Sequence, residues 1–106
     1  DRAFVNNLLR AAYTGLPRYN EMISATVPQW DRERLFTVDT MLIACGLAEA
    51  QTFPEIPVKV TINEYVEISK FYSTPKSRSF VNGILDRLIQ QMVNEGKIVK
   101  SGKGLL

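Results

Sequence analysis

The strongest constraint on the fold is a long helical repeat of apolar residues in the last third of the chain. A helix over about Lys76 to Asn94 is predicted because apolar residues recur there at intervals of three and four positions. The repeat consists of Phe80, Val81, Ile84, Leu85, Leu88, Ile89, Met92 and Val93. Such a face must be buried against other parts of the chain. We therefore expect Ile84, Leu85 and Leu88 to be largely buried, and Gly96 to form the C-cap.

The rest of the sequence also favours helices, separated by short breaks that contain proline or glycine. Apolar periodicity predicts helices over residues 1–14, 17–26, 32–51 and 59–71. We expect Gly15 to end the first helix and Pro28 the second. The third is almost continuously apolar from Met41 to Ala48, so we expect it to be the central helix.

These segments predict one all-α domain, a bundle of about five helices over residues 1–96. Residues 97–106 hold three lysines and two glycines and no acidic residue. We expect them to form a basic flexible tail.

The composition excludes several classes of protein. The 106 residues include no His and one Cys, so the usual general base, the commonest metal ligand and any intrachain disulfide are missing. We therefore expect no enzyme activity, no metal and no cofactor. No apolar run approaches the ~20 residues that span a bilayer. The net charge of +2 is far below that of a strongly basic nucleic-acid-binding domain.

The start of the last predicted helix carries the strongest candidate for a binding site. Lys76, Ser77 and Arg78 lie there, shortly before Phe80. Two cations, a hydroxyl and the free N–H groups of a helix start can bind a phosphate, and an aromatic ring can stack on an unpaired base. The alternative is an ordinary capped helix with Phe80 in the core. The residues alone leave both interpretations open.

Asn82 and Gly83 interrupt this helix close to its apolar face. Both residue types disfavour the middle of a helix, which indicates a tertiary reason for their presence. We expect Asn82 to bond a neighbouring element and Gly83 to admit a close backbone approach. The alternative is direct contact with a ligand.

Two short motifs add a resemblance to a known family. Residues 62–64 read I-N-E and residues 80–86 read F-V-N-G-I-L-D. With the segment around them, residues 56–88, they resemble the C-terminal part of the NusB family of bacterial transcription antitermination factors. A weaker resemblance extends over most of residues 1–96. It implies a cytoplasmic, all-helical protein that binds the boxA element of leader RNA together with NusE, a small-subunit ribosomal protein, within the transcription elongation complex, and supports transcription of ribosomal RNA.

The resemblance also implies roles for single residues. RNA contacts fall by position on Lys76, Ser77, Arg78 and Phe80. Glu49 matches an acidic position that faces NusE. Because a carboxylate at the end of a helix opposes the helix dipole, a cation from the partner would compensate it. The residues of the structural motif are Asn63, Glu64, Asn82, Gly83 and Asp86.

Two features of the resemblance set its limits. The Arg-rich segment and first two helices of the family have no counterpart from Asp1 onward, so we expect the family's N-terminal helices to be missing from residues 1–96. Two alternative functions stay open: the NusB-like N-terminal domain of an rRNA cytosine methyltransferase, and a helical protein-binding scaffold. Asp86 favours the antitermination factors, because the methyltransferase domains often have Arg there.

Overall fold

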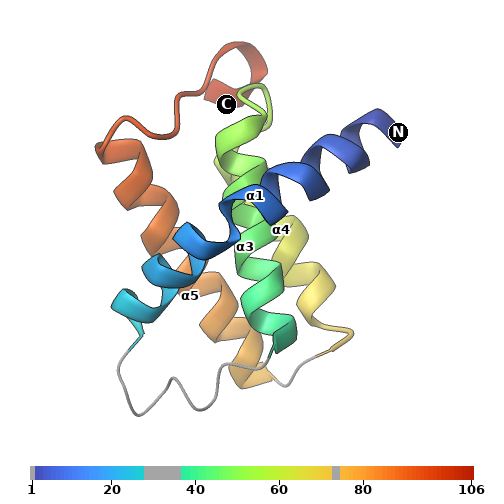
Figure 1. Cartoon of the computed structure of the whole chain (residues 1–106), viewed down its shortest axis with the longest axis vertical. Helices are drawn as coiled ribbons and strands as arrows, with labels where there is room; N and C mark the ends of the chain where they lie inside the picture. The colour runs from blue at the N-terminus through green and yellow to red at the C-terminus, as the bar shows by residue number, and fades with distance from the viewer. Residues whose placement is uncertain (1, 28–36, 73–74) are drawn as a thin grey trace.

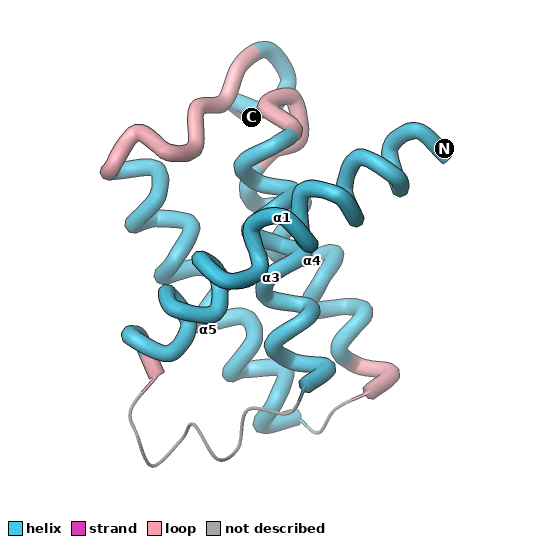
Figure 2. Tube along the Cα trace, viewed as in Figure 1, coloured by secondary structure: helices cyan, strands magenta, loops and turns pink. Residues whose placement is uncertain are grey.

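The computed structural model describes residues 2–27, 37–72 and 75–106, and within these ranges all regular structure is helical. The elements are α1 (Arg2–Thr26), α3 (Thr37–Thr52), α4 (Val58–Ser69), α5 (Pro75–Asn94) and a short 3-10 helix, η1 (Gly102–Leu105). α3 packs against α1, α4 and α5. α1 crosses α3 (Figure 1), whereas α4 and α5 run alongside it (Figure 2). The all-α bundle and the central position of the predicted third helix are therefore confirmed.

The core lies where the apolar face of α5 meets α3. Fully buried side chains of α5 pack there with those of α3: Val81, Leu85, Leu88, Ile89 and Met92 with Ile43, Ala44, Leu47 and Ala48. Gly46 lets the two helices approach closely, since a Cβ on it would lie 2.7 Å from Cδ2 of Leu85. The predicted burial of Leu85 and Leu88 is confirmed. Ile84 is only half buried, because it lies at the edge of the apolar face.

α1 is one continuous helix where the sequence predicts two. Gly15 is buried inside it, and a Cβ there would lie 2.5 Å from Cε2 of Tyr19. The predicted break at Gly15 is therefore wrong, because this glycine makes room for an aromatic ring one turn later. Pro17 costs the helix one N–H donor without ending it. Four α-helices, rather than about five, lie in the described residues. Pro28 and residues 32–36 of the predicted third helix fall outside those residues.

The C-terminus of α5 closes as the sequence predicts. Gly96 has a φ of 75°, in the left-handed region that favours glycine. Its N–H donates to the carbonyl of Val93 at 3.1 Å, and the N–H of Lys97 donates to that of Met92 at 2.8 Å. This pair of bonds is the Schellman arrangement, which confirms Gly96 as the C-cap.

Residues 97–106 pack on the loop between α3 and α4, whereas the sequence predicts a flexible tail. Ile98 is buried, and the N–H of Ser101 donates to the carbonyl of Pro54 at 3.1 Å. Gly104 approaches the same residue so closely that a Cβ would lie 1.9 Å from the Pro54 oxygen. The many polar residues of this segment suggested that it is free. The buried side chain of Ile98 and the backbone contacts with Pro54 hold it against the bundle.

Candidate functional site

The four residues predicted to contact RNA lie in the first turns of α5 but on different sides of it. At about 100° per residue, Arg78 and Phe80 are about 200° apart around the helix axis. Phe80 is half buried and packs against the core, whereas Lys76 is exposed. Arg78 is half buried on the side that faces α4. The structure therefore brings these residues to one end of α5 without placing them on one face.

The hydroxyl of Ser77 is already engaged inside the chain. It donates a hydrogen bond to the carboxylate of Asp39 on α3, which is only 2% exposed. Burial raises the pKa of Asp39, and the hydrogen bond from Ser77 partly opposes that shift. Ser77 thus joins the starts of α3 and α5, and any contact with RNA would compete with this bond.

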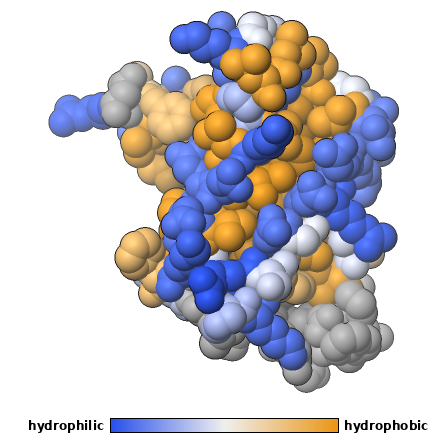
Figure 3. All heavy atoms as spheres, turned by 180° about the vertical axis from the view of Figure 1, so that it is seen from behind, coloured by the Kyte–Doolittle hydropathy of each residue, from blue (hydrophilic) through white to orange (hydrophobic). Residues whose placement is uncertain are grey.

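A groove runs between the second half of α4 and the first half of α5. Its volume is about 310 Å³, and its lining consists of Val66, Lys70, Pro75, Arg78, Ser79 and Asn82. Two cations from two helices thus face the same space. Figure 3, which looks from behind the view of Figure 1, shows hydrophilic side chains in bands with apolar side chains between them.

Asn82 is exposed and forms part of the groove wall, so its place fits ligand contact better than the expected bond to a neighbouring helix. Gly83 is also exposed, and among the described residues no atom lies within 4 Å of a Cβ built on it. The expected close backbone approach at Gly83 is therefore wrong. Asn63 and Asp86 are exposed as well.

Glu49 is not at the surface, where the resemblance would have it meet NusE. It is 1% exposed. Its Oε2 accepts a hydrogen bond of 2.6 Å from the hydroxyl of Thr61, and its Oε1 lies 3.5 Å from the hydroxyl of Tyr65. The Glu64 carboxyl also hydrogen-bonds Glu49. In the chain by itself α4 already satisfies the carboxylate, and its pairing with a partner's cation stays a prediction.

The compensating cation at this end of α3 comes from the chain itself. The Nζ of Lys100 donates to the carbonyl oxygens of Ala50 at 2.8 Å and Phe53 at 3.0 Å. A cation at a helix C-terminus is favoured by the helix dipole. Burial lowers the pKa of Lys100, and the charge of Glu49 opposes that shift. Lys100 therefore supplies a positive charge at this helix end from within the chain.

The Glu49 cluster, defined as Glu49, Thr61, Glu64, Tyr65 and Lys100, also affects how its members titrate. Burial, then the charge of Glu49, raises the pKa of Glu64 and that of the Tyr65 hydroxyl. The thiol of Cys45 has a raised pKa for the same two reasons. A thiol with a raised pKa is a weak nucleophile near neutral pH. The cluster is thus a structural network of hydrogen bonds around the Glu49 carboxylate.

The described ranges contain neither a metal-binding cluster nor a membrane-spanning helix. Within residues 2–27, 37–72 and 75–106, no group of three or more His, Cys, Asp or Glu side chains could hold a metal ion. No helix within these residues is long and apolar enough to cross a membrane.

A comparison with known protein families classifies the chain. The profile of the NusB family matches residues 1–90. The chain belongs to the NusB family. The predicted family resemblance is therefore confirmed, and its C-terminal motifs lie on α4 and α5.

Named relatives agree with this classification, and all three are called transcription antitermination protein NusB. The protein of Salinibacter ruber is 33% identical over 105 residues, which are 99% of this chain and 66% of that protein. The protein of Chloroherpeton thalassium is 34% identical, covering 97% of this chain and 49% of that protein. The protein of Thermodesulfovibrio yellowstonii is 34% identical, covering 91% and 64%.

A solved structure supports the fold assignment. NusB of T. maritima superposes with a TM-score of 0.74 and 34% identity, over 85% of this chain and 63% of that one. The chain thus spans from about half to about two thirds of the length of these relatives. All three relatives carry the name of a transcription antitermination protein, and none carries the name of an enzyme.

The sequence did not indicate three residues that line the groove or bond the end of α3 in the structure. Lys70 was missed as a groove residue, although it lies four positions after Val66 on the same side of α4. Thr61 and Lys100 gave no signal, because their contacts with α3 join residues 12 and 50 positions apart in the chain.

Proposed function

We propose that this NusB-family chain contributes to an RNA-binding transcription antitermination factor. The factor acts in the cytoplasm with NusE on boxA-type leader RNA and supports transcription of ribosomal RNA. Family membership over residues 1–90 supports the class of function, and the names of the relatives support antitermination.

The observation that carries the RNA-binding part is the position of Lys76 and Arg78. Both cations lie in the first turn of α5, where the helix dipole favours an anion. Within the described residues neither takes part in an ion pair, whereas Lys70 and Lys97 do. Cations without an internal partner are available to phosphate oxygens, which supply most of the affinity in such complexes.

The contact with NusE is part of the proposal, and Glu49 would join it only by giving up its hydrogen bonds inside the bundle. The carboxylate of Glu49 is bound by Thr61 inside the bundle. A Glu49→Lys substitution would place a second cation beside Lys100 in a buried site, and its main effect would be on folding. NusE binding is best measured by calorimetry on the unchanged chain.

The RNA-binding test compares two double variants with the same loss of charge. Lys76→Ala with Arg78→Ala removes one lysine and one arginine at the candidate site. Lys59→Ala with Arg87→Ala removes the same two residue types at exposed positions elsewhere on α4 and α5. Binding to a boxA-type RNA is measured by fluorescence anisotropy over a range of salt concentrations, after thermal melts have shown that both variants fold.

We expect the first variant to bind more weakly and its salt dependence to flatten by about 0.7 per lost phosphate contact. The control variant should change far less in both respects. Equal affinities of the folded Lys76/Arg78 variant and the unchanged chain at low salt would exclude this end of α5 as the RNA site.

A further inference from the structure

The groove between α4 and α5 contains the chemistry that binds a phosphodiester. Arg78 offers a planar fork of donors and Lys70 a compact positive charge, a pair of groups that commonly hold phosphate. Ser79 and Asn82 add a hydroxyl and an amide, which bind phosphate oxygens in many nucleic-acid complexes. Lys70 is the C-cap residue of α4 and the other three lie on α5, so a ligand there would bridge the two helices.

The groove has a size and setting that suit a short stretch of single strand. Its volume of about 310 Å³ is at the lower end of the usual range for ligand sites. Phe71 and Tyr72 follow Lys70 directly and are 83% and 69% exposed. Exposed aromatic rings next to cations form stacking platforms for unpaired bases. This combination favours a single-stranded nucleic acid over an acidic peptide, which has no bases to stack.

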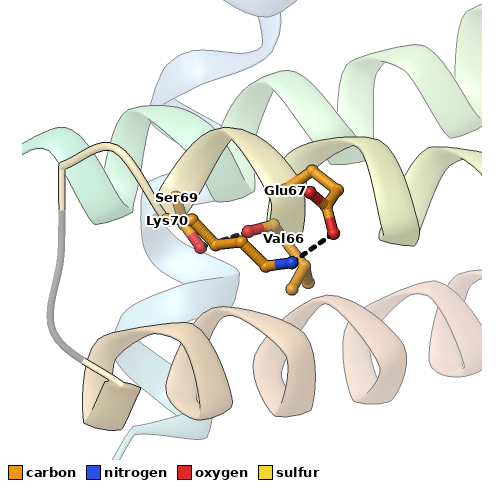
Figure 4. Close-up of polar contacts among 4 residues, drawn as sticks. All are labelled: Val66, Glu67, Ser69 and Lys70. Carbon is orange, nitrogen blue, oxygen red and sulfur yellow. Dashed lines mark hydrogen bonds and ion pairs between the residues drawn. The ribbon is translucent and has the colours of Figure 1, made fainter.

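In the chain by itself, Lys70 is held by a neighbouring carboxylate. Its Nζ forms an ion pair with Oε1 of Glu67, one turn earlier on α4. Figure 4 shows the Lys70 side chain reaching back along α4 to Glu67, with Val66 beside it and α5 running alongside. The two side chains are 44% and 65% exposed, so the pair is weak and a phosphate can compete for the ammonium group.

We propose that this groove is a backbone subsite for single-stranded RNA, and that Glu67 lowers its affinity by holding Lys70. This inference rests on the proposed function, because it assumes that RNA is the ligand. The groove lies on the side of α5 opposite to Phe80. Val66 of α4 and its C-cap residue Lys70 line it, and neither belongs to the family motif at residues 80–86. Glu67 then weakens RNA binding, and its removal should strengthen it.

The test uses another exposed ion pair of the described residues as a matched control. Lys97 and Glu95 are 3.6 Å apart near the end of α5 and are also largely exposed. Glu67→Gln and Glu95→Gln therefore each remove one negative charge and release one lysine. We expect Glu67→Gln to bind a boxA-type single-stranded RNA about two- to fivefold more tightly at low salt, the range for an exposed pair. Glu95→Gln should change the affinity much less.

A double-mutant cycle shows whether Glu67 acts through Lys70. Lys70→Gln should weaken binding, and in that background Glu67→Gln should lose most of its gain, since no ammonium group remains to be released. Phe71→Leu should weaken binding to the RNA but not to inorganic polyphosphate, which has no bases. Circular dichroism melts check that each variant folds.

The outcomes separate this inference from the proposed function. If Glu67→Gln and Glu95→Gln have equal effects, or if the gain persists without Lys70, the groove is not an RNA subsite even though the chain binds RNA elsewhere. An acidic peptide that gains as much as RNA from Glu67→Gln would overturn RNA as the occupant. If the unchanged chain binds no RNA at any salt concentration, the proposed function itself fails, and this subsite fails with it.

Discussion

The Glu49 cluster and the groove between α4 and α5 contain similar side chains in opposite settings. Each has a lysine, a glutamate and a hydroxyl group, and each lies along α4. In the Glu49 cluster, the hydrogen bonds to the carboxylate are buried inside the chain. In the groove, the ion pair is exposed, and the cation of Arg78 faces open space.

This difference shows which charged side chains are available to a partner. Breaking a buried network leaves an unsatisfied group in a medium of low dielectric constant, so such a network stabilises the fold and resists exchange. An exposed pair contributes little to stability and exchanges partners easily. Lysine, glutamate and hydroxyl side chains occur in both regions, and burial decides their role. The following changes test this comparison from the largest expected effect to the smallest.

Leu85→Ala removes packing from the core between α3 and α5. Leu85 is fully buried where α5 meets α3, so we expect its truncation to lower the free energy of unfolding by about 2–5 kcal/mol. Chemical denaturation measures the change. Ile84→Ala, at a half-buried neighbouring position, should cost clearly less. A transition of Leu85→Ala that coincides with that of the unchanged chain would contradict the assigned core.

Thr61→Val tests the buried region alone. The substitution keeps the shape of the side chain but removes the donor at 2.6 Å from the Glu49 carboxylate. We expect a loss of about 1–3 kcal/mol in the free energy of unfolding, the cost of an unsatisfied buried group. The control is Ser79→Ala in the groove, an exposed hydroxyl whose removal should change stability by less than about 0.5 kcal/mol. Similar losses for both variants would break the distinction between the two regions.

Glu64→Gln tests the hydrogen bond between Glu64 and Glu49, with the smallest expected effect, below about 1 kcal/mol for a partly exposed pair. Because folding raises the pKa of Glu64 above its ordinary value of 4.5, the folded chain binds the Glu64 proton more tightly than the unfolded chain. The contribution of Glu64 to stability is therefore present below pH 4.5 and is lost as pH rises through the folded pKa.

The amide of Gln can still donate to Glu49 but carries no charge. We expect the Glu64→Gln variant to be more stable than the unchanged chain near pH 7, and the difference to shrink as the pH falls towards 4.5. Thermal melts across this pH range measure it, with the exposed Glu21→Gln as the control. A difference that is constant with pH would contradict the hydrogen bond between Glu64 and Glu49.

The family and the main helices were predictable because their signals are local. The apolar repeat on α5, its C-cap at Gly96 and the continuous apolar run in α3 each depend on neighbours within a few positions. The motifs at 62–64 and 80–86 indicated the NusB family for the same reason, and the match over residues 1–90 confirms it.

The site was less predictable because the roles of its side chains depend on other helices. Arg78 and Phe80 are close in sequence, yet the helical turn separates them, so one cation faces α4 while the ring packs against the core. Ser77 is bound by Asp39 from a different helix. Whether these residues contact RNA stays a prediction, but the structure shows that they cannot form one flat surface.

By itself, the sequence determined what depends on short-range physics: the helical period, the apolar faces, the glycine cap of α5 and the family to which these patterns belong. Only the tertiary structure decided which polar groups are inside. Glu49 is enclosed by residues from other parts of the chain. Thr61 bonds its carboxylate, and Lys100 bonds the carbonyl of Ala50 at the end of its helix. Gly15 is required because the Tyr19 ring packs against it, and Gly104 because the backbone of Pro54 approaches it. Neither glycine is there to end a helix. Such contacts are set by packing between elements, and the free energy of burying a charge depends on what the other elements bring to it.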